Sequence, residues 1–387
     1  MAEKKKRSWL KKIGWALLIL FVLANMAILV SGKLFFYKAL LYNYADIDDL
    51  DLFESREIKN GTPQEWSVGA DYNKAKLPAA TLAELEKNKS VAFLIIKDDS
   101  IRYEQYWESY DQSSLSNSFS MAKSFVSVLI GIALDEGKIK SLDEPVGNYI
   151  PHFKEGRNAT LTIRQVLMMS AGLNWEESYS NIFSVTTEAY YGTNLAKLVD
   201  NMQVVSEPGK KFDYMSGNTL VLGMIVEKAT GMKLADYASE KLWKPMGATH
   251  AAEWSLDHKD GLEKAYCCFY TNARDFARFG KLYLDSGAWN GKQLISRDYV
   301  RQSLTPASLD FTGNEINCYG YQWWITEEKG HHIFYCRGLG GQYIVVIPDK
   351  KIIFVRLGHK REPADEKSHK LIDLPIYISG VLDMYGN

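Results

Sequence analysis

The sequence predicts a mixed α/β fold of the α+β type, in which both ends of the chain form one antiparallel sheet flanked by helices and a mostly helical region is inserted between them. Two groups of strand-like runs carry this prediction. Residues 91–96 and 101–107 form the first group, and the turn Lys97-Asp98-Asp99-Ser100 joins them as in a hairpin. The second group lies near the C-terminus: residues 319–325, 332–336, 342–347 and 352–357. Helical patterns dominate residues 120–305, and a final helix is expected over 367–384.

The N-terminal end adds a predicted transmembrane helix outside this fold. Residues 1–12 form a basic leader with six lysine or arginine residues against one acid, Glu3. Residues 13–32 follow, and 13–30 carry no charged side chain. A helix rises about 1.5 Å per residue, so this run comes close to spanning the hydrocarbon core of a bilayer. A cleaved secretory signal is the alternative; we favour an uncleaved anchor because the apolar core of a signal is usually only ~7–15 residues long.

The charges around the span predict its orientation. Basic residues precede it and few follow it, which places the N-terminus in the cytoplasm and the main domain outside the cytoplasm, in the periplasm or the extracellular space. Residues 33–77 contain an acidic patch over 46–51 and several Gly and Pro interruptions, so we predict a linker there and a folded domain over 78–387. A chain that starts near Asp46 is therefore expected to be soluble and active.

The composition argues against several functional classes. Among 387 residues, 46 Lys and Arg face 47 Asp and Glu, so the chain has no overall basic field that would hold nucleic acid. The four cysteines, Cys267, Cys268, Cys318 and Cys336, lack the spacing of a zinc site. A disulfide is possible in an oxidising compartment, but the neighbours Cys267 and Cys268 would face different ways on regular structure, so we predict that all four are packing residues. We expect no metal, no organic cofactor and no nucleic-acid partner.

The first candidate catalytic motif is Ser120-Met121-Ala122-Lys123, at the start of an apolar helix expected over 125–134. Residues three apart on a helix share a face, so the Ser120 hydroxyl and the Lys123 amine can meet. The N–H beside a serine at a helix start can hold an oxyanion, and an apolar setting lowers the pKa of a lysine toward that of a useful base. The same S-x-x-K pattern occurs at residues 8–11, and an N-cap serine with an exposed lysine is the alternative.

The second element is Glu207-Pro208-Gly209-Lys210-Lys211-Phe212-Asp213-Tyr214-Met215-Ser216, which leads into another helical pattern. With the first motif, it resembles the serine β-lactamase and penicillin-binding superfamily, in the class C-like branch of 6-aminohexanoate-dimer hydrolase and related esterases. The resemblance runs from about Ser90 to the C-terminus and includes three further stretches: Leu167-Met168-Met169-Ser170-Ala171-Gly172-Leu173-Asn174-Trp175, Tyr319-Gly320-Tyr321-Gln322-Trp323-Trp324 and Arg337-Gly338-Leu339-Gly340-Gly341-Gln342. It implies a β-lactamase/transpeptidase-like fold.

The resemblance also implies roles for individual residues. Ser120 matches the acylated nucleophile, Lys123 its proton acceptor and Tyr214 the second base. Ser216 falls where the wider superfamily often has asparagine. Tyr179-Ser180-Asn181 matches the family's Y-S-N letters more literally. It lacks the Pro-Gly-x-x-Phe approach and the apolar helix that follows, so we favour Tyr214.

The third family motif departs furthest from the pattern. Where β-lactamases have Lys-Thr-Gly on the strand that lines the site, this chain has Cys336-Arg337-Gly338. Gly338 keeps the glycine that close approach of a substrate requires, and the Leu339 N–H is the expected second oxyanion donor beside that of Ser120. Adjacent side chains on a strand face opposite ways, so Arg337 need not replace the missing lysine, and a surface arginine is the alternative.

These motifs together predict a serine hydrolase of small-molecule esters or amides. Ser216, Trp175, Trp324 and Arg337 are candidate cleft-lining residues, although tryptophan more often packs in a core. The missing lysine weakens pairing with the carboxylate of a β-lactam or a D-alanyl peptide, so a β-lactamase or D-alanyl-D-alanine peptidase is the second hypothesis. A non-catalytic envelope module that binds acyl or peptide ligands is the third.

Overall fold

A seven-stranded sheet forms the centre of the protein. The computed structural model describes residues 2–311, 314–364 and 371–386. The strands lie in the order β12 (Trp324–Glu328), β13 (His331–Gly338), β14 (Gln342–Ile347), β15 (Ile352–Gly358), β3 (Ser90–Lys97), β4 (Ser100–Tyr106) and β2 (Ser67–Val68). All neighbours are antiparallel except β2 and β4. The prediction that both chain ends build one antiparallel sheet is confirmed.

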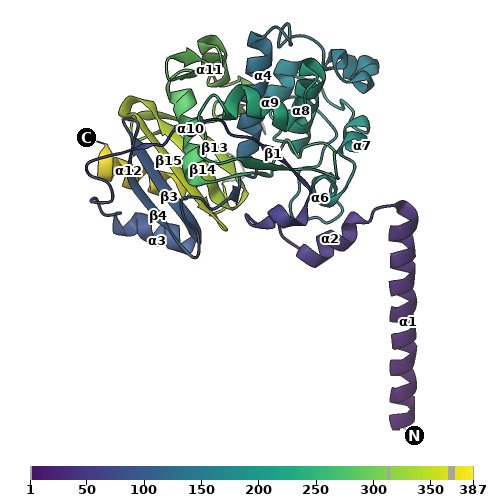
Figure 1. The fold of residues 1–387 in the computed structure, drawn as a ribbon. Helices are drawn as coiled ribbons and strands as arrows, with labels where there is room; N and C mark the ends of the chain where they lie inside the picture. The colour runs from purple at the N-terminus through teal and green to yellow at the C-terminus, as the bar shows by residue number, and fades with distance from the viewer. Residues whose placement is uncertain (1, 312–313, 365–370, 387) are drawn as a thin grey trace.

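Helices cover both faces of this sheet because its strands alternate between two hydrophobic clusters (Figure 1). In β3, Leu94 and Ile96 join the cluster of α4 (Met121–Asp135) and α10 (Ala273–Leu284). Phe93 and Ile95 point the other way, into the cluster of α3 (Ala79–Lys87) and α12 (Leu374–Tyr385). The period of two along a strand produces this division.

The inserted region is mostly helical, as predicted. Its helices are α5 (Ile163–Leu167), α6 (Val185–Tyr191), α7 (Leu195–Asp200), α8 (Ser216–Thr230), α9 (Leu234–Ala238) and α11 (Arg297–Ser303), with the short turns η2 (Val146–Asn148), η3 (Pro151–Lys154), η4 (Gly156–Thr160) and η5 (Ser239–Trp243). A second, four-stranded sheet has the order β1 (Ser55–Ile58), β6 (Ala252–Ser255), β7 (Phe269–Thr271) and β5 (Ser116–Asn117). The pairs β8 (Ala288–Trp289) with β9 (Lys292–Gln293) and β10 (Leu309–Phe311) with β11 (Asn314–Ile316) complete the strands of the described residues.

Two predicted elements differ from the structure at their starts. Of the predicted run 319–325, only Trp324 and Ile325 belong to β12. Tyr319 instead forms an isolated bridge with Trp324. The final helix, expected over 367–384, begins at Leu374. Residues 365–370 lie outside the described part of the chain.

The N-terminal helix α1 (Ala2–Ser31) projects away from the rest of the protein (Figure 1). Residues 8–31 are long and apolar enough to cross a membrane, and no residue of their most apolar stretch is buried. A signal sequence has the same properties.

The predicted linker over 33–77 is wrong for much of its length, because this segment contributes elements to the domain. It contains the helix α2 (Phe35–Tyr42), the turn η1 (Asp49–Leu52), and the strands β1 and β2. Strand β1 pairs with β6 and strand β2 with β4. Main-chain hydrogen bonds therefore attach β1 to the four-stranded sheet and β2 to the seven-stranded sheet.

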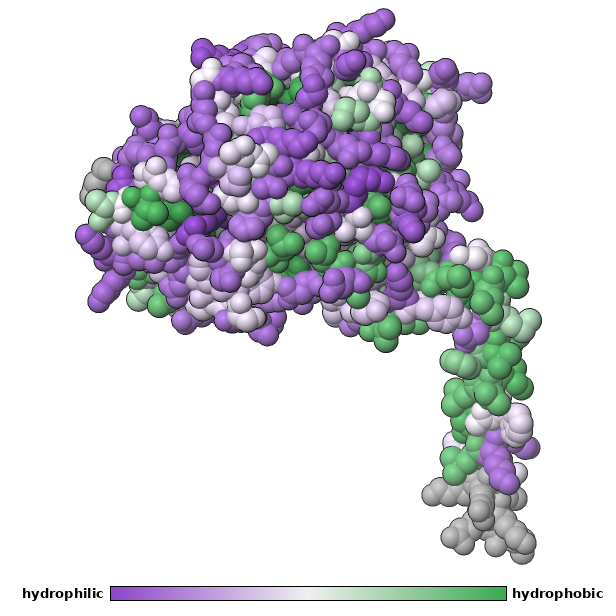
Figure 2. All heavy atoms as spheres, viewed as in Figure 1, coloured by the Kyte–Doolittle hydropathy of each residue, from purple (hydrophilic) through white to green (hydrophobic). Residues whose placement is uncertain are grey.

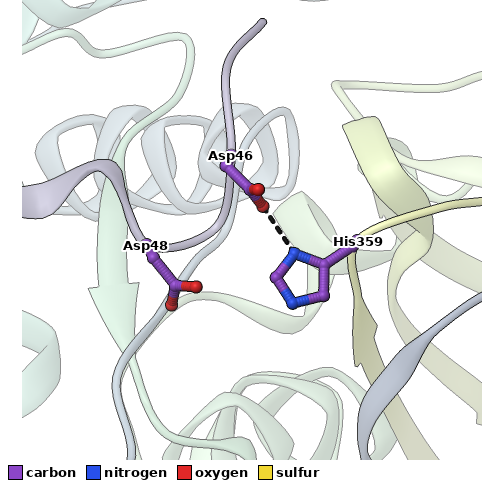
Figure 3. A group of neighbouring side chains, drawn as sticks. All are labelled: Asp46, Asp48 and His359. Atoms are coloured by element: carbon purple, nitrogen blue, oxygen red, sulfur yellow. Dashed lines mark hydrogen bonds and ion pairs between the residues drawn. The ribbon is translucent and has the colours of Figure 1, made fainter. Parts of the chain in front are cut away.

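The acidic patch within this segment also contacts the domain, although Asp46 and Asp48 remain exposed. The His359 ring donates to the Asp46 carboxylate at 2.6 Å, with Asp48 beside them (Figure 3). The Tyr190 hydroxyl donates to Asp49 at 2.8 Å. Between these acids, the buried Ile47 accepts a main-chain hydrogen bond from Asn117. The stretch 46–49 is thus held against α6, β5 and His359, the residue that follows β15.

Candidate active site

Ser120 lies at the N-cap position of α4, directly after a constrained turn. Phe119 has a φ of 43°, in the left-handed region that a residue with a side chain rarely adopts. Its N–H donates to Asn117 Oδ1 at 2.8 Å, and the same oxygen accepts from the Cys268 N–H at 3.1 Å. Asn117 in turn donates to the Tyr270 hydroxyl at 2.9 Å. This network fixes the direction in which α4 starts, and with it the position of Ser120.

Lys123 lies one turn along α4 and is almost completely buried. Its Nζ donates to Ser120 Oγ at 2.9 Å, to the Tyr266 carbonyl oxygen at 3.0 Å and to Ser216 Oγ at 3.3 Å. Burial lowers the pKa of Lys123 to about 8, although the negative charge of Glu177 acts in the opposite direction. A large share of the amine is therefore neutral at mildly alkaline pH.

Tyr214 contacts Ser120 from the loop that precedes α8. The Ser120 side chain lies close enough to lower the pKa of Tyr214, and Lys123 Nζ lies 5.1 Å from the centre of the Tyr214 ring. Burial raises the pKa of Tyr214 to about 12, while the Ser120 side chain and the charge of Arg337 oppose the rise. The phenol therefore keeps its proton at neutral pH.

Tyr179, the alternative tyrosine, occupies a different place. Its ring is half exposed, its hydroxyl donates to Glu177, and the nearby Ser216 side chain opposes the rise in its pKa that burial causes. Tyr214 is the tyrosine that contacts Ser120, and Tyr179 reaches the site through Glu177 and Ser216.

Glu177 is a residue of this site that the sequence did not indicate. Its carboxylate accepts from the Ser216 N–H and the Ser216 hydroxyl, both at 2.7 Å, and from Trp175 Nε1 at 2.8 Å. Ser216 also accepts from Lys123, so the carboxylate is linked to the amine through one hydroxyl. A single acid that lies 39 residues before its partner carries no recognisable pattern.

The end of β13 lies directly beside the turn that carries Ser120. A Cβ atom on Gly338 would lie 2.3 Å from the Ser118 carbonyl oxygen, so only glycine fits there. Strand β12 begins at Trp324, opposite Tyr335, so residues 336–338 extend beyond it and are paired with β14 alone among the described strands.

Cys336 and Arg337 point to opposite faces of β13, as the alternation predicts. Cys336 is buried against α4, where its thiol meets Ser124 and burial raises its pKa. The Arg337 guanidinium lies 3.7 Å from the centre of the Trp324 ring, and its charge acts on Tyr214. Arg337 is therefore on the same face as Tyr214 instead of standing in solvent.

A cleft of about 530 Å³ opens beside Ser120. Its lining includes Ser120, Ser216 and Leu339, together with Glu177 and Tyr179. This volume falls in the range of pockets that bind small organic ligands.

The two tryptophans predicted at the cleft, Trp175 and Trp324, lie behind the residues that line it. Trp175 is buried and positions Glu177 through its indole N–H. Trp324 is also buried, with its ring centre 5.5 Å from that of Tyr214, and it carries Arg337 on its face.

Comparison with known proteins identifies this arrangement. The sequence model of the Beta-lactamase family matches residues 79–374, which is most of the chain. The chain belongs to the Beta-lactamase family. It is therefore a member of a family of serine hydrolases that share the β-lactamase and penicillin-binding fold.

Several relatives of this Beta-lactamase family member are amide or ester hydrolases by name. The 6-aminohexanoate-dimer hydrolase of Paenarthrobacter ureafaciens is 27% identical over 330 residues, which cover 80% of this chain and 82% of the relative. A Bacillus anthracis protein provisionally named for the same activity superposes with a TM-score of 0.74 at 21% identity, covering 89% of this chain and 93% of that protein. A family VIII carboxylesterase superposes with a TM-score of 0.61 at 15% identity, covering 82% and 98%.

All four cysteines of this Beta-lactamase family chain pack in or against the hydrophobic clusters, as predicted, but the expectation that Cys267 and Cys268 face different ways is wrong. Cys267 and Cys268 form a disulfide between neighbouring residues. Such a bond needs a local bend, and Cys268 has a φ of 64° instead of the regular conformation that we assumed. Cys267 lines the cleft, and Tyr266, directly before it, provides the carbonyl that accepts from Lys123.

Proposed function

We propose that this chain is a membrane-anchored serine hydrolase that cleaves ester or amide bonds of small molecules through an acyl-enzyme on Ser120. The observation that carries the proposal is the buried Lys123 amine, 2.9 Å from Ser120 Oγ, with a pKa lowered to about 8. A lysine with such a pKa can act as a base near neutral pH, whereas an exposed lysine is almost fully protonated. The hydrolase names of the relatives are consistent with this chemistry.

In the first step, neutral Lys123 accepts the Ser120 proton and Ser120 Oγ attacks the substrate carbonyl. Tyr214, protonated at neutral pH, is placed to pass a proton toward the leaving alcohol or amine. The backbone N–H groups of Ser120 and Leu339 are the proposed donors to the oxyanion, because Leu339 lines the cleft beside Ser120.

In the second step, water attacks the acyl-enzyme and releases the acid. The same groups serve in reverse, with Lys123 and Tyr214 removing a proton from water and returning one to Ser120 Oγ. Glu177 is the proposed positioning residue for Ser216, which borders Lys123. The steps use only protein groups and water, so we propose no metal or organic cofactor.

The N-terminal helix is the proposed membrane anchor. Residues 13–30 carry no charged side chain and lie away from the domain, and the basic leader precedes them. We propose a single-pass topology with the catalytic domain on the extracytoplasmic side.

A D-alanyl-D-alanine peptidase or β-lactamase is the second candidate, and one observation favours it. The charges of Arg337 and Arg361 both lower the pKa of Tyr214, so two cations act on the region beside Ser120. They could pair with a substrate carboxylate in place of the lysine that the family motif has and this chain lacks.

Parallel assays with p-nitrophenyl acetate and nitrocefin test the choice between these candidates. We expect measurable hydrolysis of the neutral ester, abolished in Ser120→Ala, and poor turnover of nitrocefin. Arg337→Gln is expected to lower nitrocefin turnover more than the ester rate, because a neutral ester requires no partner for a carboxylate. Efficient nitrocefin turnover with negligible esterase activity would reverse the order of the candidates.

A further inference from the structure

The cleft shares a wall with the segment that emerges from the proposed membrane helix. Ala39, Asn43, Tyr44 and Ala45 line the cleft, and α2 begins only a few residues after α1 ends. The next residue, Asp46, is fastened to His359 (Figure 3). Residues 32–46 therefore hold the C-terminal end of α1 close to the opening of the cleft.

The surface around this wall is strongly apolar. The side chains of Leu40, Leu41 and Tyr44 are 63%, 75% and 73% exposed, and that of Phe183 is 74% exposed. Phe183 contacts Phe36 of α2, with ring centres 5.3 Å apart, so α2 and the loop before α6 form one surface. Figure 2 shows hydrophobic atoms continuing from α1 onto the adjoining part of the domain.

Such a surface is costly in water but suits the interface of a bilayer. Large apolar side chains clustered on an exposed face usually mark a contact surface. In this segment they are interleaved with Lys33, Lys38 and the tyrosines Tyr37 and Tyr42, and Lys and Tyr are typical of the headgroup level. In Figure 1, α2 runs roughly across the direction of α1, as expected of a helix that lies in the interface below the domain.

Apolar and aromatic side chains also line part of the cleft, as a substrate from a bilayer would require. Phe119, Ile182, Tyr190 and Tyr191 contribute to it together with the α2 residues. An acyl chain could therefore leave the bilayer beside α2 and reach Ser120 along apolar side chains.

We propose that the substrate is a bilayer-embedded lipid with a long acyl chain in ester or amide linkage, taken directly from the leaflet on which the domain sits. The proposal rests on the proposed function, because it uses the same Ser120 chemistry. The bond between the acyl carbon and the headgroup oxygen or nitrogen breaks and a bond from that carbon to Ser120 Oγ forms. The headgroup leaves with the Ser120 proton, and water then releases the fatty acid and restores the hydroxyl.

The test uses the full chain in dioleoylphosphatidylcholine vesicles with two esters of the same leaving group. 4-Methylumbelliferyl oleate partitions into the vesicles, and 4-methylumbelliferyl acetate stays in solution. In the double variant Leu40→Glu with Leu41→Glu, we expect hydrolysis of the oleate ester to fall about tenfold or more, because each charge removes an apolar contact with the bilayer. Hydrolysis of the acetate ester should stay unchanged, since neither leucine lines the cleft.

Val68→Glu is the matched control. Val68 is 60% exposed on β2, at the edge of the sheet opposite β12, and the substitution should affect neither ester. Equal effects of the α2 charges on both esters, or an α2 variant that changes the oligomeric state, would overturn the proposal and leave the esterase function standing. Failure of Ser120-dependent hydrolysis on both esters would overturn the proposed function itself.

Discussion

Burial deprives the Lys123 amine of the water that would stabilise its positive charge, and its pKa falls to about 8 as a result. The nearby Glu177 carboxylate favours the charged form and limits the fall. The same carboxylate holds Ser216, which touches the amine. At the scale of single residues, the reactivity of Ser120 thus depends on a balance between desolvation and one negative charge.

This balance predicts the pH dependence of the reaction. The neutral amine is the active form, so kcat/KM for p-nitrophenyl acetate should rise with pH, with a midpoint near 8, and then level off. Glu177→Gln removes the charge that raises the pKa of Lys123, so the midpoint should move to lower pH. Glu176→Gln, at the exposed neighbouring position, is the control and should leave the midpoint in place. A midpoint that moves to higher pH in Glu177→Gln would contradict the assignment.

The two tyrosines provide the second prediction. Tyr214→Phe removes the hydroxyl that contacts Ser120 and should lower kcat by about 10²–10⁴. Tyr179→Phe removes a hydrogen bond to Glu177 at the cleft edge and should change kcat little. The turnover of the two purified variants on p-nitrophenyl acetate decides this, and the opposite ranking would make Tyr179 the second base.

Local sequence identified some residues of the site and missed others for physical reasons. Ser120 and Lys123 belong to one helical turn, and Tyr214 belongs to a loop with a recognisable approach, so their spacing carries information. Glu177 acts through the fold, since it meets Ser216 only after α8 and the loop before α6 pack together. The Cys267 disulfide depends on a backbone bend that residue spacing does not reveal.

At the scale of elements, the segment after α1 differs most from its prediction. Its acidic and interrupted sequence is typical of a linker, yet α2 forms part of the cleft wall and β1 completes the second sheet. The strands of the main sheet were predictable because their apolar runs and turns are local. The packing of residues 33–77 against the domain was not predictable, because its partners β6, α6 and His359 are distant in the sequence.

The wall formed by α2 leads to a third prediction, which reverses the expectation for a chain that starts near Asp46. A chain that starts at Lys33 keeps α2 and should retain the kcat/KM of the full chain on p-nitrophenyl acetate. A chain that starts at Asp46 loses Ala39, Tyr44 and Ala45 from the cleft and should lose about tenfold, the effect expected for one lost apolar contact of moderate size. Equal kcat/KM values for the two purified chains would show that the α2 wall takes no part in the reaction.

At the scale of the whole molecule, two distant parts of the chain meet at the nucleophile. The turn before α4 carries Ser120, and the end of β13 passes so close to it that Gly338 admits no side chain. The anchor lies outside this arrangement, whereas the segment directly after it forms part of the cleft. This arrangement places a hydrolytic site beside the proposed membrane surface.

The central claim is that Ser120 carries the acyl group, and covalent labelling tests it most directly. The full chain is treated with a fluorophosphonate probe, and the modified peptide is located by mass spectrometry. We expect one adduct on Ser120, lost in Ser120→Ala and retained in Ser8→Ala, which removes the serine of the other S-x-x-K sequence. Ester hydrolysis that continues in Ser120→Ala, or an adduct located on another serine, would contradict the account.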